Sequence, residues 1–268
     1  MSGGPMKDGP MKDGKSLNDY AALLDAAAAE GREVPQISND RGFTVEEGYA
    51  IQALSLARRY ARGEKRVGIK MGLTSRAKMV QVGVDEVIWG RLTDAMRVEE
   101  GGSIPLSRYA HPRVEPELAF LMRAPLAGDV SNAEAMAAVA AVAPAMEIID
   151  SRYQNFKFTL PDVVADNSSS SGFVLGGWAD PSLDFANLGL VMEVDGRPVQ
   201  LGSTAAILGH PIRSLVAAAR MVARWGESLK PGDIVLAGGA TAAHPLAAGM
   251  HIRTEFQSLG AVSFSVTE

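Results

Sequence analysis

The spacing of apolar positions divides the chain into regions of different character. Residues 1–15 show no apolar periodicity, are rich in Gly and Pro and repeat Pro-Met-Lys-Asp-Gly, which is typical of a disordered tail. Leu17 to Ala29 carries apolar residues at helical spacing and ends near Gly31. A second helical stripe follows Thr44-Val-Glu-Glu47, which is a capping box. We therefore expect a tail over residues 1–15 and a helical region over residues 16–65.

From Arg66 onward, short strand-like runs dominate. Two longer patterns, residues 132–141 and 210–225, predict helices, whereas the polar residues 162–171 indicate a loop. Asp195-Gly196 between two apolar runs predicts a hairpin. Further strands are expected near residues 67–71, 113–122, 145–150, 172–175, 233–236, 250–256 and 261–266. The irregular spacing excludes regular βα alternation. We predict an α+β fold in which residues 66–268 form one domain around a curled, largely antiparallel sheet.

Two glutamates interrupt the apolar pattern of one predicted strand. Because successive side chains of a strand point to opposite faces, Glu115 and Glu117 share a face that continues as Ala119 and Leu121. A solvated face would be the ordinary explanation for such a pair. The apolar continuation argues against it, since burying two like charges is costly unless a cation or hydrogen bonds compensate.

A third glutamate lies in another apolar run. Glu147 is flanked by Ala145-Met146 and Ile148-Ile149, where a bare carboxylate would be expensive. The chain contains no cysteine, so thiolate sites are excluded. Carboxylate oxygens suit a hard divalent cation. Glu115, Glu117 and Glu147 are therefore candidate ligands of Mg²⁺, with Mn²⁺ as the alternative.

Two further segments carry candidate chemistry. Lys70 is apolar on both sides, which fits either a lysine that reaches solvent from a strand edge or one that serves as acid, base or oxyanion stabiliser. The turn Gly72-Leu-Thr-Ser75 after it offers amide N–H groups and hydroxyls to a carboxylate. Arg152 and Lys157 lie among aromatics, either in an ordinary surface loop or in a lid whose cations meet an anionic substrate.

Composition removes several function classes. The formal charge is −5, from 26 basic and 31 acidic residues, and no basic run has interleaved aromatics, which argues against nucleic-acid binding. No apolar run reaches the roughly 18–20 residues of a membrane span, and no apolar signal core opens the chain. The expected location is the cytoplasm. None of the four histidines is paired at metal-ligand spacing.

Six motifs occur together and in a fixed order. This set resembles the 2-keto-4-pentenoate hydratase / 4-oxalocrotonate decarboxylase family within the fumarylacetoacetate hydrolase superfamily, over residues 40 to 268. The motifs are Gly68-Ile-Lys-Met-Gly-Leu-Thr-Ser75, His111-Pro-Arg-Val-Glu-Pro-Glu117, Glu147-Ile-Ile-Asp-Ser-Arg152, Val164-Ala-Asp-Asn167, Leu208-Gly-His-Pro211 and Gly238-Gly-Ala-Thr-Ala-Ala243.

The resemblance implies a fold, a metal and a substrate. It implies a fumarylacetoacetase C-terminal-like mixed β-roll with an N-terminal helical cap, Mg²⁺ at the three glutamates and a catalytic Lys70. The substrate would be a small keto-diacid. By the same resemblance, the substrate-binding residues would be Leu73, Thr74, Ser75, Asp85, Arg152, Lys157, Ser169 and Thr241.

Within the family the sequence is more similar to the decarboxylases than to the hydratases. Residues 70–79, 150–158 and 238–243 carry that likeness, whereas Asp85 is the residue typical of hydratases. The implied reaction converts 2-oxo-3-hexenedioate (4-oxalocrotonate) to 2-hydroxypenta-2,4-dienoate and CO₂ in the meta-cleavage degradation of aromatic compounds. Hydration of that dienol, C–C hydrolysis and a non-catalytic subunit of the hydratase are the alternatives. The resemblance also implies a homo-oligomer and a complex with the hydratase. Lys70 as a Schiff-base lysine remains a second mechanism.

Overall fold

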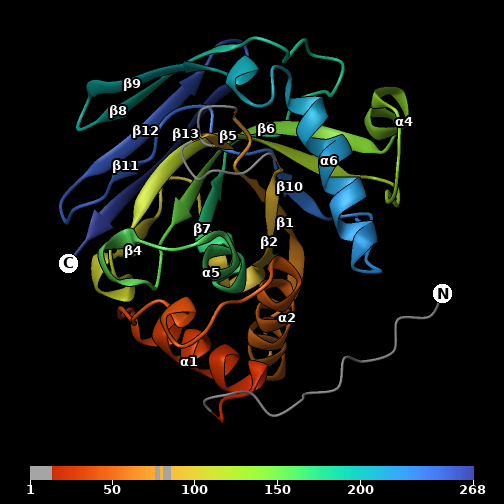
Figure 1. Ribbon diagram of the computed structural model, residues 1–268. Helices are drawn as coiled ribbons and strands as arrows, with labels where there is room; N and C mark the ends of the chain where they lie inside the picture. The colour runs from red at the N-terminus through yellow and green to blue at the C-terminus, as the bar shows by residue number, and fades with distance from the viewer. Residues whose placement is uncertain (1–13, 76–78, 81–85) are drawn as a thin grey trace.

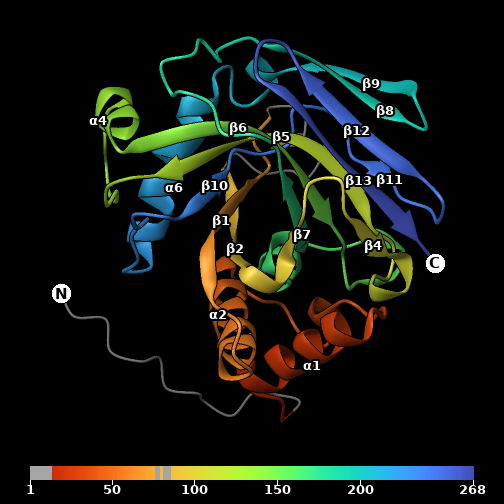
Figure 2. The same ribbon diagram turned by 180° about the vertical axis from the view of Figure 1, so that it is seen from behind.

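The computed structural model describes residues 14–75, 79–80 and 86–268. Figures 1 and 2 show two helices at one end of the molecule and two curved sheets at the other, with a third long helix against the outside of the larger sheet. In the part of the chain that is described, no helix combines the length and apolarity needed to cross a membrane.

The two N-terminal helices form as their capping boxes predict. Helix α1 (Leu17–Glu30) is capped by Ser16 with Asp19, and α2 (Val45–Ala61) by Thr44 with Glu47. Gly31 ends α1 in the left-handed conformation, with φ 60°. The helices bury Tyr20, Leu24 and Ile51 around Tyr153, a residue from the segment that follows the third glutamate. Val34 N–H also donates to Arg152 O at 2.7 Å, so the helices are attached to that segment.

The larger sheet has the order β2-β1-β10-β5-β6-β7-β3, and β11 pairs with the free end of β5. Its pairings are antiparallel except for β1 with β10 and β3 with β7. The strands are β1 (Arg66–Gly72), β2 (Ile88–Thr93), β3 (Arg97–Val98), β5 (Arg113–Met122), β6 (Val139–Ile149), β7 (Ser170–Leu175), β10 (Ile234–Leu236) and β11 (His244–Pro245).

The smaller sheet has the order β4-β13-β12-β8-β9. The expected hairpin is confirmed, with Asp195 and Gly196 at φ 52° and 73° between β8 and β9. Val114, Ile148 and Val174 of the larger sheet pack against Ile252 and Phe264 of the smaller one. The strands are β4 (Ser103–Pro105), β8 (Gly189–Val194), β9 (Arg197–Ser203), β12 (His251–Phe256) and β13 (Gly260–Thr267). The α+β class and the largely antiparallel curled sheet are therefore confirmed.

Two of the predicted segments were wrong. The helix expected over residues 132–141 ends early: α4 spans Asn132–Ala137, and β6 begins at Val139 because its alanines pair with β5. The polar residues 162–167, expected as a loop, belong to α5 (Leu160–Ala165) and its end, because Thr159 and Asp162 form another capping box. Helix α6 (Pro211–Arg224) agrees with prediction, and His210 caps it.

The two faces of β5 separate as the alternation predicts. Val114, Leu118 and Phe120 are buried in apolar clusters on one side. Ala119 packs on the opposite side with Ala145 and Leu236 of the neighbouring strands. Glu115 and Glu117 lie on that second face, inside the curl of the larger sheet.

Candidate metal centre and active site

Three carboxylates meet on the concave face of the larger sheet. Glu115 on β5 lies directly opposite Glu147 on β6, and Glu117 is two residues further along β5. One carboxylate oxygen from each lies within 4.8 Å of the others. The three residues are 8%, 0% and 0% exposed. Among the described residues this is the one cluster of three metal-ligating side chains.

Lys70 supplies the positive charge beside the cluster. It comes from β1, two strands away from β5 in the sheet, and only 4% of its side chain is exposed. Its Nζ lies 2.9 Å from Glu147 Oε2. Lys70 is therefore not a lysine that extends to solvent from the sheet edge.

Two oxygens of the cluster lack a donor in the part of the chain that the structure describes. Glu117 Oε2 accepts a hydrogen bond of 2.7 Å from Gly238 N–H, but Glu117 Oε1 and Glu147 Oε1 are buried with no hydrogen-bond partner among the described residues. Buried carboxylate oxygens without partners are costly. A hard divalent cation with oxygen ligands fits this donor set.

Burial dominates the protonation of these groups. Desolvation, followed by the charge of Glu147, raises the pKa of Glu117 well above its usual value. Burial also raises the pKa of Glu147, against the opposing charge and hydrogen bond of Lys70. A cation bound between the carboxylates would reverse these shifts, because it favours the ionised forms.

The turn after β1 and the loop after β10 close one side of the centre. Leu73 adopts a left-handed conformation at φ 56°, and Leu208 N–H donates to Thr74 O at 2.8 Å. Gly238, at φ 105°, is so close to this turn that a Cβ there would lie 1.9 Å from Thr74 Oγ1. That hydroxyl is buried and has no partner. Gly238 thus allows both its own N–H and the Thr74 hydroxyl to approach the glutamates.

A left-handed turn brings serines to the other side. Asn167, Ser168 and Ser169 (η5, Asn167–Ser169) all have φ between 50° and 61°, a strained arrangement for non-glycine residues. The Asn167 side chain holds it by accepting from Arg91 N–H at 2.8 Å and donating to Arg91 O at 2.9 Å. The hydroxyls of Ser169 and Ser170 are both buried with no hydrogen-bond partner among the described residues, and Ser170 is near enough to Glu147 to oppose the rise of its pKa. Ser170 and the Gly238 amide were missed by the sequence, since neither stands out from its polar or glycine-rich run.

Two other predicted substrate-binding residues make their side-chain contacts away from the glutamates. Arg152 is buried against Asp166 and donates to Ser171 Oγ at 2.6 Å, and Thr241 donates to Ala242 O at 3.0 Å. Lys157 is exposed after η4 (Gln154–Phe156). Ser75 accepts from Met79 N–H at 3.0 Å through its backbone carbonyl. Asp85 lies outside the described residues.

Comparison with known proteins agrees with the geometry. Residues 69–267 match the fumarylacetoacetate (FAA) hydrolase C-terminal family. The chain is 59% identical to a 4-oxalocrotonate decarboxylase of Pseudomonas sp. over 94% of this chain and 98% of the relative. It is 37% identical to a TodF product hydratase of Pseudomonas putida, over 91% of this chain and 92% of the relative. The structure of 4-oxalocrotonate decarboxylase from Pseudomonas putida G7, complexed with magnesium and adipate, aligns with a TM-score of 0.91 at 40% identity, covering 93% of this chain and 97% of that one.

Proposed function

The chain belongs to the fumarylacetoacetate hydrolase family, and we propose that it is a Mg²⁺-dependent decarboxylase of 2-oxo-3-hexenedioate. The products are 2-hydroxypenta-2,4-dienoate and CO₂. Identity of 59% over nearly the whole of a 4-oxalocrotonate decarboxylase supports this substrate and places the enzyme among the carboxy-lyases of aromatic meta-cleavage degradation. The observation that carries the chemistry is the buried group Glu115, Glu117 and Glu147, in which Glu117 Oε1 and Glu147 Oε1 lack a hydrogen-bond partner among the described residues.

The substrate needs an electron sink at its keto oxygen. When the bond between C5 and the distal carboxyl breaks, its electron pair forms the C4–C5 double bond, the C3–C4 double bond shifts to C2–C3, and negative charge arrives on the oxygen at C2. A divalent ion held by Glu115, Glu117 and Glu147 would supply Lewis acidity for that oxygen. A keto acid can chelate such an ion through its keto oxygen and adjacent carboxylate.

We assign Lys70 to the same oxygen. Its Nζ lies 2.9 Å from Glu147 and is held by a side chain that is almost fully buried, so it can stabilise the developing enolate and deliver the proton of the dienol. The short contact to Glu147 favours this electrostatic role over a Schiff base, in which Nζ would be bonded to the substrate carbon.

The buried hydroxyls on both sides of the glutamates suit the carboxylate next to the keto group. Thr74 Oγ1 and Ser169 Oγ have no hydrogen-bond partner within the described ranges of the chain, and each can donate one hydrogen bond. Leu73 and Ser75 belong to the same turn and would shape the site around that end of the substrate. The distal carboxylate must reach solvent as CO₂, and exposed Lys157 is the cation we propose to meet it before it leaves. Arg152, Asp85 and Thr241 remain proposals from family resemblance.

The test offers both family substrates to the same Mg²⁺-loaded protein. With 2-oxo-3-hexenedioate we expect CO₂ release, and with 2-hydroxypenta-2,4-dienoate we expect no formation of 4-hydroxy-2-oxopentanoate. The reverse result would make the protein a hydratase, which similarity to hydratases at 37% identity keeps as the second candidate. Inactivation by borohydride that depends on substrate, with activity surviving EDTA, would replace the metal mechanism by a Schiff base at Lys70.

We also propose an assembly and a location. The resemblance that suggests decarboxylation suggests a homo-oligomer that binds the hydratase of the same pathway, in the cytoplasm. Mass measured by light scattering, alone and after mixing with such a hydratase, tests both associations. Activity of the isolated chain on 2-oxo-3-hexenedioate would eliminate the reading in which it is a non-catalytic partner.

A further inference from the structure

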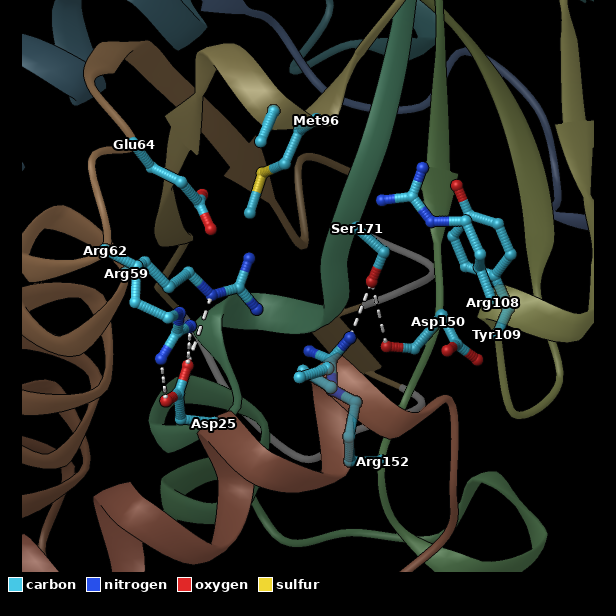
Figure 3. A pocket seen from close by; sticks show the side chains of 13 residues that line it. Asp25, Arg59, Arg62, Glu64, Met96, Arg108, Tyr109, Asp150, Arg152 and Ser171 are labelled. Atoms are coloured by element: carbon cyan, nitrogen blue, oxygen red, sulfur yellow. Dashed lines mark hydrogen bonds and ion pairs between the residues drawn. The ribbon is translucent and has the colours of Figure 1, made fainter.

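A second polar cavity, separate from the glutamates, lies between helices α1 and α2 and one end of the larger sheet (Figure 3). Its volume is about 190 Å³. Four arginines line it: Arg59, Arg62, Arg108 and Arg152. None of the three glutamates, Lys70 or Thr74 is part of its wall.

Two of the four arginines already have acidic partners. Arg62 makes two hydrogen bonds of 2.7 Å to the two oxygens of Asp25. Arg152 is bonded to Asp166 and to the Ser171 hydroxyl. These pairs hold the cavity wall together and leave little donor capacity for a ligand.

Arg59 is different, because its ion pair with Asp25 is a long one. Its Nε lies 3.8 Å from Asp25, beyond hydrogen-bond distance, and no hydrogen bond of its side chain occurs among the described residues. Only 13% of the side chain is exposed. In Figure 3 the terminal guanidinium nitrogens of Arg59 point into the cavity, while its Nε faces Asp25. Burial, and then the nearby charge of Arg152, lowers the pKa of Arg59.

The acids around the cavity are hydrogen-bonded to other donors. Asp150 accepts from the N–H groups of Ala110 and His111 at 2.9 and 2.8 Å, and Glu64 accepts from the Thr93 hydroxyl at 2.6 Å. With Asp25 and Asp166 bonded to Arg62 and Arg152, the formal charges of four arginines and four acids balance. Within the described chain none of these four acids accepts a hydrogen bond from Arg59, although the cavity does not lack negative charge.

Two side chains at the rim of the cavity also carry hydrogen-bond donors that have no acceptor among the described residues. Arg108 is exposed on η3 (Leu106–Arg108), and its side chain makes no hydrogen bond or ion pair with the described residues. Tyr109 beside it lines the cavity, and its hydroxyl likewise has no hydrogen-bond partner in the described chain. A ligand with several oxygen acceptors would satisfy Arg59 inside and Arg108 at the entrance, as guanidinium groups commonly do for carboxylates and phosphates.

We propose that this cavity is a binding site for a small oxyanion, a carboxylate or a phosphate, with Arg59 as its main contact. Its walls come from α1, α2 and the segment 150–152, which follows Glu147 in the chain. An anion bound there would cross-link the N-terminal helices to the end of the strand that carries Glu147. The proposed main contact, Arg59, has no role in the decarboxylase mechanism, and the wall includes neither the three glutamates nor Lys70, so anion binding is tested separately from decarboxylation.

The test measures anion binding to the full-length, EDTA-treated protein, in which the glutamates hold no metal. Thermal unfolding is followed while sodium phosphate or sodium acetate is added, against sodium chloride at equal ionic strength. We expect a saturable rise in Tm with phosphate or acetate that chloride does not give. The anion with the stronger effect identifies which oxyanion chemistry the site prefers.

Three variants connect the effect to the cavity. Arg59→Gln should weaken anion binding by roughly tenfold or more, because a buried charge-assisted hydrogen bond is lost. Arg108→Gln, at the exposed rim, should weaken it by a few fold without disturbing folding, and gives an answer if Arg59→Gln fails to fold. Arg197→Gln, on exposed β9, is the matched control and should bind as the unaltered protein does.

Chemical modification gives a second measurement on the unaltered protein. Phosphate or acetate should protect Arg59 from an arginine-specific dicarbonyl reagent, as seen by mass spectrometry, and leave Arg197 unprotected. Absence of a saturable anion effect, or equal binding by the unaltered protein and both cavity variants, would overturn the proposal.

Discussion

The glutamate centre and the arginine cavity both bury charged side chains, but they balance them differently. At the glutamate centre, three carboxylates lie together, Lys70 pairs with Glu147, and two carboxylate oxygens have no partner in the described part of the chain. At the cavity, acids and arginines are equal in number, and two pairs of them, Arg62 with Asp25 and Arg152 with Asp166, are hydrogen-bonded. The comparison teaches that partnerless atoms, more than net charge, indicate where a ligand belongs. It also distinguishes hydrogen-bonded ion pairs, which stabilise the fold, from side chains with free ligand atoms, which can bind a metal or substrate.

The largest loss of decarboxylase activity is expected from removing a carboxylate from the glutamate centre. Glu117→Gln should lower kcat/KM for decarboxylation by about 10³-fold, the equivalent of several kcal/mol of lost Lewis-acid stabilisation. The metal-free variant should unfold at a higher temperature than the metal-free unaltered protein, because a strained buried charge is gone. Steady-state CO₂ release and calorimetric unfolding measure the two effects.

Glu64→Gln is the matched control for that substitution, since Glu64 belongs to the cavity and lies apart from the glutamates. It should leave kcat/KM unchanged. Full activity in Glu117→Gln would refute the ligand assignment.

Lys70→Met should reduce kcat by about 10²-fold or more, because the cation beside the developing oxyanion is lost. The side chain is similar in length, so the sheet should keep its packing. Substrate KM should change much less than kcat, since the interaction strengthens only as charge develops. A kcat within a few fold of the unaltered enzyme would remove Lys70 from the mechanism.

Arg152→Gln should affect stability more than catalysis. It leaves the fully buried Asp166 without its cation, and breaking such a pair costs on the order of 3–5 kcal/mol. The pKa of Asp166 is already raised to about 6 by burial, in spite of Arg152. Chemical denaturation measures the loss. A large rise in KM with unchanged stability would instead return Arg152 to the substrate, as the family resemblance suggests.

The stability of the metal-free protein should depend on pH through Glu117. Folding raises the pKa of this carboxyl above its usual 4.5, so the folded chain retains a proton that the unfolded chain releases. Stability from this group is fully present below pH 4.5 and is lost as pH rises through the raised value. Mg²⁺ should therefore raise Tm more at higher pH. Thermal unfolding with EDTA or with Mg²⁺, measured from below pH 4.5 upward, tests this pH dependence. A rise of Tm by Mg²⁺ that is the same at every pH would contradict it.

The smallest effect is expected at Lys157. An exposed cation that meets the distal carboxylate should contribute modestly, so Lys157→Ala should raise KM by a few fold. The matched control Lys230→Ala, at another exposed lysine, should leave KM unchanged. Unchanged kinetics in Lys157→Ala would exclude it from the site.

Residues of the glutamate centre could be predicted from the sequence because the side chains of a strand alternate between its two faces. Glu115 and Glu117 had to share a face with Ala119, and the apolar run around Glu147 indicated a buried side chain. The apolar run around Lys70 fitted both a solvent-reaching lysine and one that serves in the chemistry. The local pattern was sufficient for the three glutamates, because each of them stands out from its apolar neighbours. What brings the four together is the strand order, which the sequence did not provide.

The arginine cavity could not be predicted from the local sequence pattern. Arg59 and Arg152 become cavity neighbours only when α2 docks against the segment after β6, and their partners are distant in sequence. β2 was missed for the same reason, because Arg91 in its centre is buried only by pairing with Gln52 and Glu227. The helix expected through residue 141 was wrong because alanine suits helix and strand alike, and pairing with β5 decided between them.

The dependence of CO₂ release on bound metal tests the central claim most directly. Protein stripped with EDTA is titrated with Mg²⁺ while CO₂ release from 2-oxo-3-hexenedioate and metal binding are measured on the same samples. The account predicts no release without metal, and a rate that rises in proportion to occupancy of one site per chain, abolished in Glu117→Gln. Full release by the stripped protein would contradict it.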